Sequence, residues 1–234
     1  MEGLRAVRDV FEAGILPELV VVREDFDDAL IDTVHESGVP VRIIEERLFT
    51  EITDVTTPQG VLAVVPMRDA GDPVVPEGRA PFYVIIDGVR DPGNLGTLFR
   101  SAAGAGVDHV FLTPETVDPY NPKTIRAAMG SHLRVRFSQI DAENLGRVVS
   151  SIGVVGLAEA DGDVDYDVVD WTQPAAIVVG GEAFGPTSLT RTLATTTVSI
   201  PLTGGVESLN AAVAGSLMIF EVARQRRVAE KQRS

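Results

Sequence analysis

From residue 82 onward, the chain alternates short runs of valine and isoleucine with longer stretches of helical periodicity. Strands that are apolar at nearly every position are buried on both faces, as in a parallel sheet that helices cover on each side. We therefore predict an α/β fold with a mostly parallel sheet and helices on both faces. The predicted strands are 83–86, 110–112, 134–137, 152–157, 177–179 and 198–201, and the predicted helices are 95–104, 123–129, 141–150 and 208–226.

A proline-rich break precedes this region. Residues 66–81 contain four prolines and two glycines and show no apolar periodicity, which indicates a linker. We predict a small α/β domain at 1–66, a linker at 67–81 and a second domain at 82–234. Because the first domain begins directly in a helix, its first strand is expected to be missing. Its expected elements are helices at 3–13, 27–37 and 45–52 and strands at 19–22, 41–44 and 60–65.

The formal net charge of −14 argues at first against a nucleic-acid partner, because phosphate binding needs a basic surface. The acidity is local, however. Residues 1–69 carry 15 acidic and 6 basic side chains, and residues 159–170 carry six acidic and no basic ones. Basic side chains remain in 222–234 and in 119–140, a segment that holds no acid and contains Lys123, Arg126, Arg134 and Arg136. These segments either contact nucleic acid or are ordinary solvated faces.

Several classes of site are excluded. The chain has no cysteine, so it has no disulfide, thiolate metal site or cysteine nucleophile, and its three histidines are scattered, so we expect no metal. Phosphate-loop, zinc-protease and serine-hydrolase motifs are absent.

No apolar run reaches the roughly 18 residues that cross a bilayer, and no signal sequence is evident, which predicts a cytoplasmic protein without membrane contact. The aspartates of 161–167 lack the glycine and glutamate of a calcium loop and are expected to form a solvated loop.

Three polar segments follow predicted strands, at the edge where parallel sheets bind ligands. The first, DGVRDPGNLGTLFR at 87–100, contains a turn, a suitable helix N-cap in Asn94 and an anion-binding candidate in Arg100. The second, GGEAFGP at 180–186, places a carboxylate after two glycines. The third, IPLTGGVESLNAAVA at 200–214, places Ser208 and Asn210 at a helix start. Each segment alone can be explained as a capped helix or a tight turn, but three on one sheet favour a ligand site.

Taken together, the three motifs resemble the signature motifs of SpoU-type (TrmH-like) RNA ribose 2′-O-methyltransferases of the knotted SPOUT superfamily. The similarity runs in order over residues 82–226 and includes the segment from Asp118 to Gly130 between the motifs. Residues 1–65 resemble the ribosomal-protein-like substrate-binding domain that is often fused in front. The resemblance implies S-adenosylmethionine as cofactor, a trefoil-knotted catalytic domain and a homodimer whose active site is completed by the partner subunit.

The motif match also implies site residues. The positions that hold the cofactor in the family correspond here to Leu157, Gly180, Ile200, Leu202 and Leu209. The catalytic or RNA-facing positions correspond to Arg100, Asn94, Glu182, Ser208 and Asn210. Ala183 stands where the family usually has glycine, a difference that matters if this position needs a positive φ.

Methyl transfer from a sulfonium to a ribose 2′-hydroxyl requires in-line positioning of donor and acceptor, without a metal or a covalent intermediate. We expect Arg100 to bind the adjacent phosphate and to stabilise the developing alkoxide, because a guanidinium is normally a hydrogen-bond donor only. Asn94 and Ser208 are expected to orient the nucleotide.

Two alternatives remain, a non-catalytic RNA-binding relative and an unrelated α/β enzyme that acts on a small molecule. The intact third motif and Arg100 argue against the first, and the basic segments argue against the second. The fused front domain favours rRNA, and 23S rRNA in particular, over tRNA as the substrate.

Overall fold

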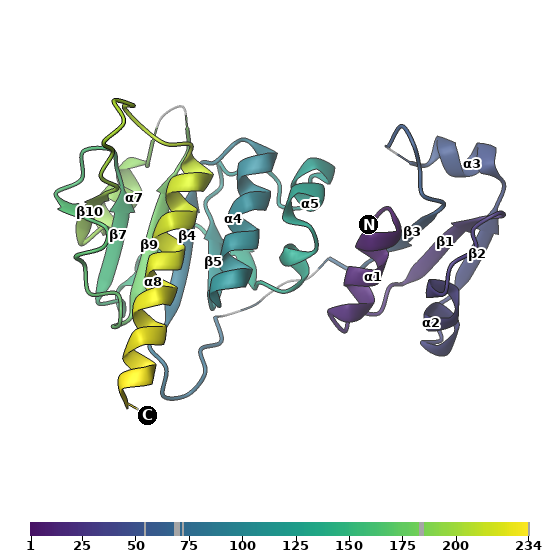
Figure 1. Ribbon diagram of the computed structural model, residues 1–234, viewed down its shortest axis with the longest axis horizontal. Helices are drawn as coiled ribbons and strands as arrows, with labels where there is room; N and C mark the ends of the chain where they lie inside the picture. The colour runs from purple at the N-terminus through teal and green to yellow at the C-terminus, as the bar shows by residue number, and fades with distance from the viewer. Residues whose placement is uncertain (54, 68–70, 72, 183–184, 234) are drawn as a thin grey trace. The chain divides into compact units, whose positions relative to one another are not determined.

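Two units with separate hydrophobic cores make up the chain, Met1–Arg68 and Asp69–Ser234 (Figure 1). The structure is a computed structural model, and it describes residues 1–53, 55–67, 71, 73–182 and 185–233. The boundary between the units falls inside the proline-rich segment. The end of that segment is held to the second unit, because Arg79 forms an ion pair with the buried side chain of Asp108.

The first unit is built on a three-stranded sheet with the order β2-β1-β3, in which β1 pairs in parallel with β2 and antiparallel with β3. Val20 and Val22 of β1 are buried in a core to which α1 and α2 contribute. Helix α2 begins at Leu30 rather than at residue 27, because Asp28 Oδ1 accepts a hydrogen bond from Leu30 N at 2.8 Å. The elements are α1 (Leu4–Glu12), β1 (Leu19–Arg23), α2 (Leu30–Glu36), β2 (Val41–Ile44), α3 (Glu46–Glu51) and β3 (Val61–Val64).

The second unit contains a seven-stranded sheet with the order β6-β5-β4-β9-β7-β10-β8, and each strand pairs in parallel with its neighbours. The predicted α/β class with a mostly parallel sheet is confirmed. Strand β6 begins at Phe137 rather than at residue 134, because a short 3₁₀ turn, η1 (Ser131–Leu133), precedes it. The strands are β4 (Phe82–Asp87), β5 (His109–Leu112), β6 (Phe137–Gln139), β7 (Val154–Ala158), β8 (Val164–Asp165), β9 (Ala175–Gly180) and β10 (Thr196–Ser199).

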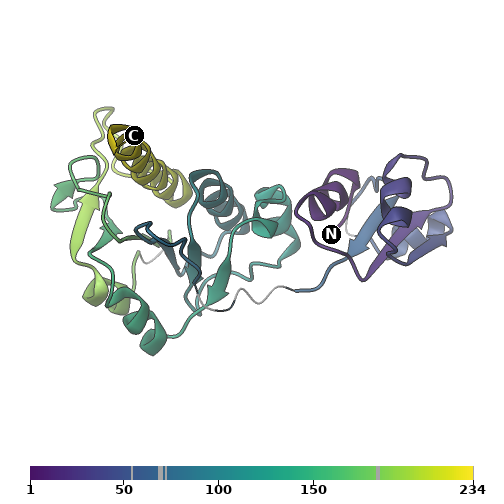
Figure 2. The ribbon, with the colours of Figure 1, turned by 90° about the horizontal axis from the view of Figure 1, so that it is seen from below.

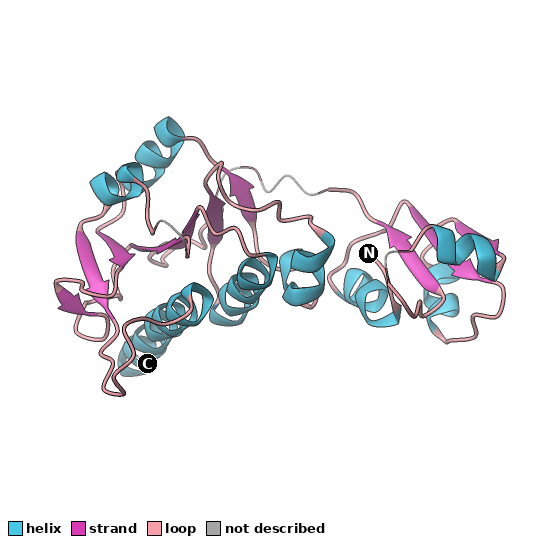
Figure 3. Ribbon diagram, turned by 90° about the horizontal axis from the view of Figure 1, so that it is seen from above, coloured by secondary structure: helices cyan, strands magenta, loops and turns pink. Residues whose placement is uncertain are grey.

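Helices cover both faces of this sheet, as Figures 2 and 3 show. One core lies between the sheet and α4 and α8, and the other lies between the sheet and α6 and α7. Alternate residues of β4 enter the two cores, Val84 and Ile86 the first and Tyr83 and Ile85 the second, which explains why the strand is apolar throughout. The helices are α4 (Pro92–Ala105), α5 (Pro122–Ala128), α6 (Ala142–Val149), α7 (Ser188–Leu193) and α8 (Ala211–Arg233).

The strand β8 and the helix α7 were not predicted. Residues 161–167 are not simply a solvated loop, because Val164 and Asp165 form the edge strand β8 beside β10. Their carboxylates do remain exposed, and charged side chains on an edge strand discourage pairing with other chains. Helix α7 was not predicted, since its sequence, SLTRTL, has few apolar residues to reveal a helical period.

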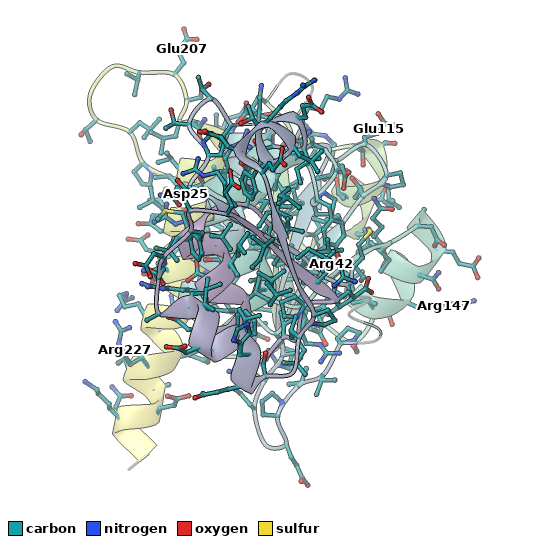
Figure 4. The ribbon with its side chains drawn as sticks, turned by 90° about the vertical axis from the view of Figure 1, so that its right-hand side faces the viewer. Asp25, Arg42, Glu115, Arg147, Glu207 and Arg227 are labelled. Carbon is teal, nitrogen blue, oxygen red and sulfur yellow. The ribbon has the colours of Figure 1, made fainter. Side chains whose placement is uncertain are left out.

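The basic segment at 222–234 is only partly available to a ligand. The guanidinium of Arg226 donates hydrogen bonds to the carbonyls of Ala80, Pro81, Trp171 and Gln173 at 2.6–3.1 Å. Burial, with a smaller contribution from Arg79, lowers the pKa of Arg226 to about 10, so the side chain stays protonated at neutral pH. Arg226 therefore fastens α8 to two loops of its own unit, whereas Arg227 projects from α8 into solvent (Figure 4).

Arg224 also forms hydrogen bonds within its own unit, to Glu221 of the same helix. Both oxygens of Glu221, which is largely buried, accept hydrogen bonds from Arg224 at 2.7 Å, and these bonds lower the pKa of Glu221 against the effect of burial. The next residue, Gln225, bonds to the loop before β9. Its Oε1 accepts from Trp171 N at 2.9 Å, and its Nε2 donates to Val169 O at 3.0 Å. The loop that ends at the buried Trp171 is thus tied to the second half of α8.

Candidate active site

A cavity of about 680 Å³ opens at the carboxyl ends of β7, β9 and β10, where parallel sheets bind ligands. All three polar strand-end segments approach it: residues of the second and third line it directly, and the first reaches its edge through Asn94. The residues predicted from the motifs that line the cavity are Gly180, Glu182, Ile200, Leu202, Ser208, Leu209 and Asn210.

Leu157, which is also predicted for the cofactor site, is not among the residues that line this cavity. Side chains alternate along β7, and that of Leu157 is buried in the core on the α6 and α7 face of the sheet. The next two residues, Ala158 and Glu159, line the cavity instead. Ala183, the position at which the sequence departs from the family pattern, lies outside the described residues.

Charged residues at the cavity were missed by the sequence reasoning. Glu159 and Asp161 follow β7, and Arg191 of α7 forms an ion pair with Glu159. The acidic run of residues 159–170 was the signal for the first two. Arg191 gave no signal, because α7 itself was not predicted.

Two glycines allow backbone segments to meet at the cavity wall. A Cβ atom at Gly181 would lie 2.1 Å from the carbonyl oxygen of Gly88, and one at Gly180 would lie 2.5 Å from the nitrogen of Pro186. Any larger residue at either position would force the chain apart. The glycine pair therefore brings the turn after β9 into direct contact with the turn after β4.

Side chains from all three segments form one chain of hydrogen bonds. Asn210 Oδ1 accepts from the backbone nitrogens of Ala212 at 2.9 Å and Val213 at 3.2 Å, so it caps α8. This fixes Asn210 Nδ2 as the donor to Asn94 Oδ1, at 3.0 Å, and leaves Asn94 Nδ2 to donate to Glu182 Oε1. The capped helix thereby sets the orientation of both amides.

The sequence predicted Asn94 as the N-cap of α4, and this prediction is wrong. The side chain of Asn94 is therefore available for the hydrogen bonds to Asn210 and Glu182. Asp91 is the N-cap, and its Oδ1 accepts a hydrogen bond from Asn94 N at 2.8 Å. Pro92 and Gly93 fill the first turn, where a proline is well tolerated. The helix therefore starts three residues earlier than predicted, and the side chain of Asn94 points to Asn210 and Glu182.

Arg100 lies apart from this hydrogen-bonded chain. Six residues separate it from Asn94, which places the two side chains about 120° apart around α4 and about 9 Å apart along it. Arg100 is exposed and makes no hydrogen bond or ion pair with the described residues. The predicted catalytic residues are thus divided between a polar cluster at the cavity and a separate surface arginine.

The four predicted RNA-contacting residues are all exposed. Lys123 and Arg126 lie on α5, and Arg134 and Arg136 lie between η1 and β6. The loop after β10 is exposed as well, and Glu207 near its tip points away from the body of the unit (Figure 4).

Within the described part of the chain, no group of three histidine, aspartate or glutamate side chains could hold a metal ion. None of the helices in the same part of the chain could span a membrane.

Asp87 is a further residue that the sequence reasoning missed. Its side chain is fully buried at the end of β4, where Oδ2 accepts from Thr187 N at 2.7 Å and from Thr190 Oγ1 at 2.6 Å. Oδ1 accepts from Thr113 Oγ1 at 3.0 Å. One carboxylate thus joins the ends of β4 and β5 to the start of α7. A charged residue closing the otherwise apolar strand FYVIID was a signal that could have found it.

Comparisons with known proteins agree with this architecture. A model of the SpoU rRNA Methylase family matches residues 81–220, and a model of the MRM3-like substrate binding domain matches residues 1–63. The chain is 30% identical to rRNA methyltransferase 3, mitochondrial, of Homo sapiens over 286 aligned residues, which cover 97% of this chain and 67% of the relative.

A bacterial relative and a solved structure match equally large parts of the chain. The chain is 32% identical to the 23S rRNA (guanosine(2553)-2′-O)-methyltransferase RlmP of Bacillus subtilis (strain 168), with 95% of this chain and 87% of the relative covered. The SpoU methyltransferase AviRb from Streptomyces viridochromogenes, solved in complex with AdoMet, superposes with a TM-score of 0.84 at 26% identity. This superposition covers 97% of this chain and 90% of that one.

Proposed function

The chain belongs to the SpoU rRNA methylase family, and we propose that it methylates a ribose 2′-hydroxyl in 23S rRNA rather than in tRNA. It is an RNA 2′-O-ribose methyltransferase, and its methyl donor is S-adenosylmethionine. The choice of 23S rRNA is supported by the similarity to RlmP over most of both chains.

The cavity at β7, β9 and β10 suits S-adenosylmethionine in size and in chemistry. Its volume of about 680 Å³ is within the range of small-molecule sites. Ile200, Leu202 and Leu209 offer apolar surface, and the glycine pair exposes backbone groups. The lining carries three carboxylates, Glu159, Asp161 and Glu182, against one cation, Arg191, and this net negative charge suits a ligand with a sulfonium and an amino group. The bound cofactor supplies an electrophilic methyl group.

The observation that carries the proposal is the meeting of Glu182, Asn94 and Asn210 at this cavity. These residues come from three separate segments, and a purely structural role would not require all three to converge beside an open cavity. We infer that Asn94 and Asn210, with Ser208, orient the target nucleotide, while Glu182 fixes the amide of Asn94. Arg100 would bind a phosphate next to the target ribose and stabilise negative charge developing on the 2′-oxygen.

Three further properties of the family belong to this proposal. We propose that the C-terminal part of the chain forms a trefoil knot, that the first unit contacts RNA, and that the protein acts in the cytoplasm. Support for the knot comes from the strand order, in which β9 lies between β4 and β7 while β10 lies beyond β7. Support for RNA contact comes from the match of residues 1–63 to a substrate-binding domain.

Methyl transfer is tested by incubating the protein with tritium-labelled S-adenosylmethionine and, separately, total rRNA and total tRNA. We expect label in rRNA, followed by mapping of one alkali-resistant 2′-O-methylated position in 23S rRNA. Label only in tRNA would contradict the choice of substrate. No label in either pool, with binding of rRNA retained, would favour a non-catalytic relative.

We also propose a homodimer formed through α4 and α8. Val213, Leu217 and Phe220 are 47%, 41% and 50% exposed and follow one another at spacings of four and three residues, which makes an apolar stripe along α8. Arg100 and Gly104 lie on the exposed side of the adjoining α4, where Phe220 approaches Gly104. A second copy covering this face would place Arg100 at the subunit interface, which suits an active site that the partner subunit completes.

Introducing a charge into this stripe is expected to separate the subunits. Phe220→Glu should convert the protein to a monomer in sedimentation equilibrium and remove methyl transfer, because a carboxylate cannot be buried there without a partner. Val168→Glu is the matched control, since Val168 is 71% exposed outside the stripe. A Phe220→Glu variant that stays dimeric would show that the interface lies elsewhere.

The basic segment at 119–140 predicts a specific response to salt. Changing Arg134 and Arg136 together to alanine should weaken RNA binding and lower the slope of log K against log salt by about 1.4–1.8, because two phosphate contacts are lost. Cofactor affinity should stay the same, since neither residue lines the cavity. An unchanged slope in filter-binding titrations would show that these arginines do not meet phosphate.

A further inference from the structure

Met129 adopts a backbone conformation that its side chain disfavours. It follows α5 with φ 47° and ψ 53°, and it is the one non-glycine residue with a positive φ among those that the structure describes. Gly130 follows with φ 78°, so two successive residues take the left-handed conformation. Glycine would adopt the first of these positions more readily than methionine.

The side chain of Met129 does little for the fold in return. It is 60% exposed, although methionine is normally a residue of protein interiors. The hydrogen bond that ends α5, from Met129 N to Arg126 O at 3.3 Å, uses only the backbone and would form with any residue. Residues in an uncommon backbone conformation cluster at active sites and ligand contacts, and here the turn holds an apolar side chain in solvent.

The surroundings of Met129 are basic. Arg126 precedes it by three residues, a spacing that puts the two on neighbouring positions of the helical turn. Both lie in the segment 119–140, which carries four lysine or arginine residues and no acid in a chain of net charge −14. Such a surface complements phosphate rather than a typical protein partner.

Helix packing also brings the end of α5, next to Met129, against α4, the helix that carries Arg100. A Cβ atom at Gly96 of α4 would lie 2.5 Å from Ala127 Cβ and 2.8 Å from Ala128 N, so α5 ends directly against this part of α4. Arg100 follows Gly96 by one helical turn on the same side of α4. In Figure 1, α4 and α5 lie side by side, in agreement with their packing.

We propose that Met129 contacts a nucleobase close to the methylated ribose, while Arg100 and Arg126 hold the neighbouring phosphates. The inference rests on the proposed function and extends it to a residue outside the three motifs. Apolar side chains, methionine included, can pack on or between bases that are partly unstacked, and a thioether makes favourable contacts with aromatic rings. The strained turn would serve to present this side chain.

The test compares three variants on unmodified 23S rRNA transcript. Met129→Gly is expected to raise Tm by about 2–4 °C by relieving strain, and to weaken RNA binding by about 5–20-fold by removing the contact. Met129→Ala should weaken RNA binding equally without the gain in Tm. Met129→Leu should bind RNA nearly as the wild type does. Cofactor affinity should be the same in all of them, because Met129 does not line the cavity.

The inference is overturned if the wild type methylates the transcript and Met129→Gly and Met129→Ala both bind it within twofold of wild-type affinity. A change in subunit association in the variants, with RNA binding unchanged, would overturn it in favour of a protein contact. If the wild type bound but did not methylate rRNA, the proposed function would fail, whereas weakened binding in the variants would still support the contact. A wild type that does not bind rRNA overturns both.

Discussion

Replacing Arg100 with alanine is expected to lower the rate of methyl transfer by about 100–1,000-fold, the effect typical of losing one donor to a developing oxyanion. The fold should not change, because Arg100 is exposed and bonds to none of the other described residues. Cofactor affinity should also stay the same, since Arg100 is not part of the cavity wall. The loss should therefore appear in kcat and in RNA affinity, measured by tritium transfer and filter binding.

Two further variants make this result specific. Arg100→Lys keeps the charge but not the planar fork of donors, so it should restore RNA affinity more than kcat. Arg147→Ala is the control for loss of an exposed arginine, because Arg147 projects from α6 on the other face of the sheet (Figure 4). Full activity in Arg100→Ala would remove both the phosphate-binding and the charge-stabilising role from this residue.

Removing the carboxylate of Asp87 is expected to have the largest effect on stability. In Asp87→Ala, Thr187 N and Thr113 Oγ1 lose their acceptor in a buried site, at a cost of about 1–3 kcal/mol each, whereas Thr190 Oγ1 can still donate to Thr187 O at 3.1 Å. The total of about 2–6 kcal/mol is a large part of the 5–15 kcal/mol that stabilises a typical domain. Because Thr187 follows the cavity residue Pro186, cofactor binding should weaken as well. Denaturant unfolding and equilibrium binding of S-adenosylmethionine measure the two effects.

The conservative variant Asp87→Asn should lose much less. Its amide oxygen can replace Oδ2, and its amide nitrogen can donate to Thr113 Oγ1, which can act as an acceptor. Val149→Ala, at the end of α6 in the core that this helix forms with the sheet, is the control for a general loss of stability. If Asp87→Ala bound the cofactor as well as a Val149→Ala protein of similar stability, Asp87 would have no role in shaping the site.

The sheet of the second unit was predictable because burial on both faces leaves a plain signal, an apolar run such as that of β4. β8 was missed because it is only two residues long and its one aspartate, Asp165, is exposed to solvent, although its backbone pairs with β10. α7 was missed because it is short and rich in threonine, and its start depends on contacts with Asp87 from 100 residues earlier. Such long-range contacts are invisible to local periodicity.

The site was predictable as a set of segments but not as a geometry. Strand-end motifs identified Asn94, Glu182 and Asn210, and only the fold shows that they share hydrogen bonds. The sequence could not show which face of the sheet the side chain of Leu157 occupies, because β7 is apolar on both faces. The sequence also predicted that the basic segment at 222–234 was available to a ligand. Arg226 is not available, because its guanidinium donates to backbone carbonyls. Backbone carbonyls carry no residue-type signal, so this role could not be seen in the sequence.

The position of Asn210 at the head of α8 has a consequence for the order in which the protein is made. Chains leave the ribosome from their N-terminus, so Asn94 and Glu182 emerge before Asn210 and the helix that it caps. The loops that Arg226 fastens also emerge before Arg226 itself. The orientation of the two amides is therefore settled late in synthesis, and the nascent enzyme cannot modify RNA until nearly all of its second unit has been translated.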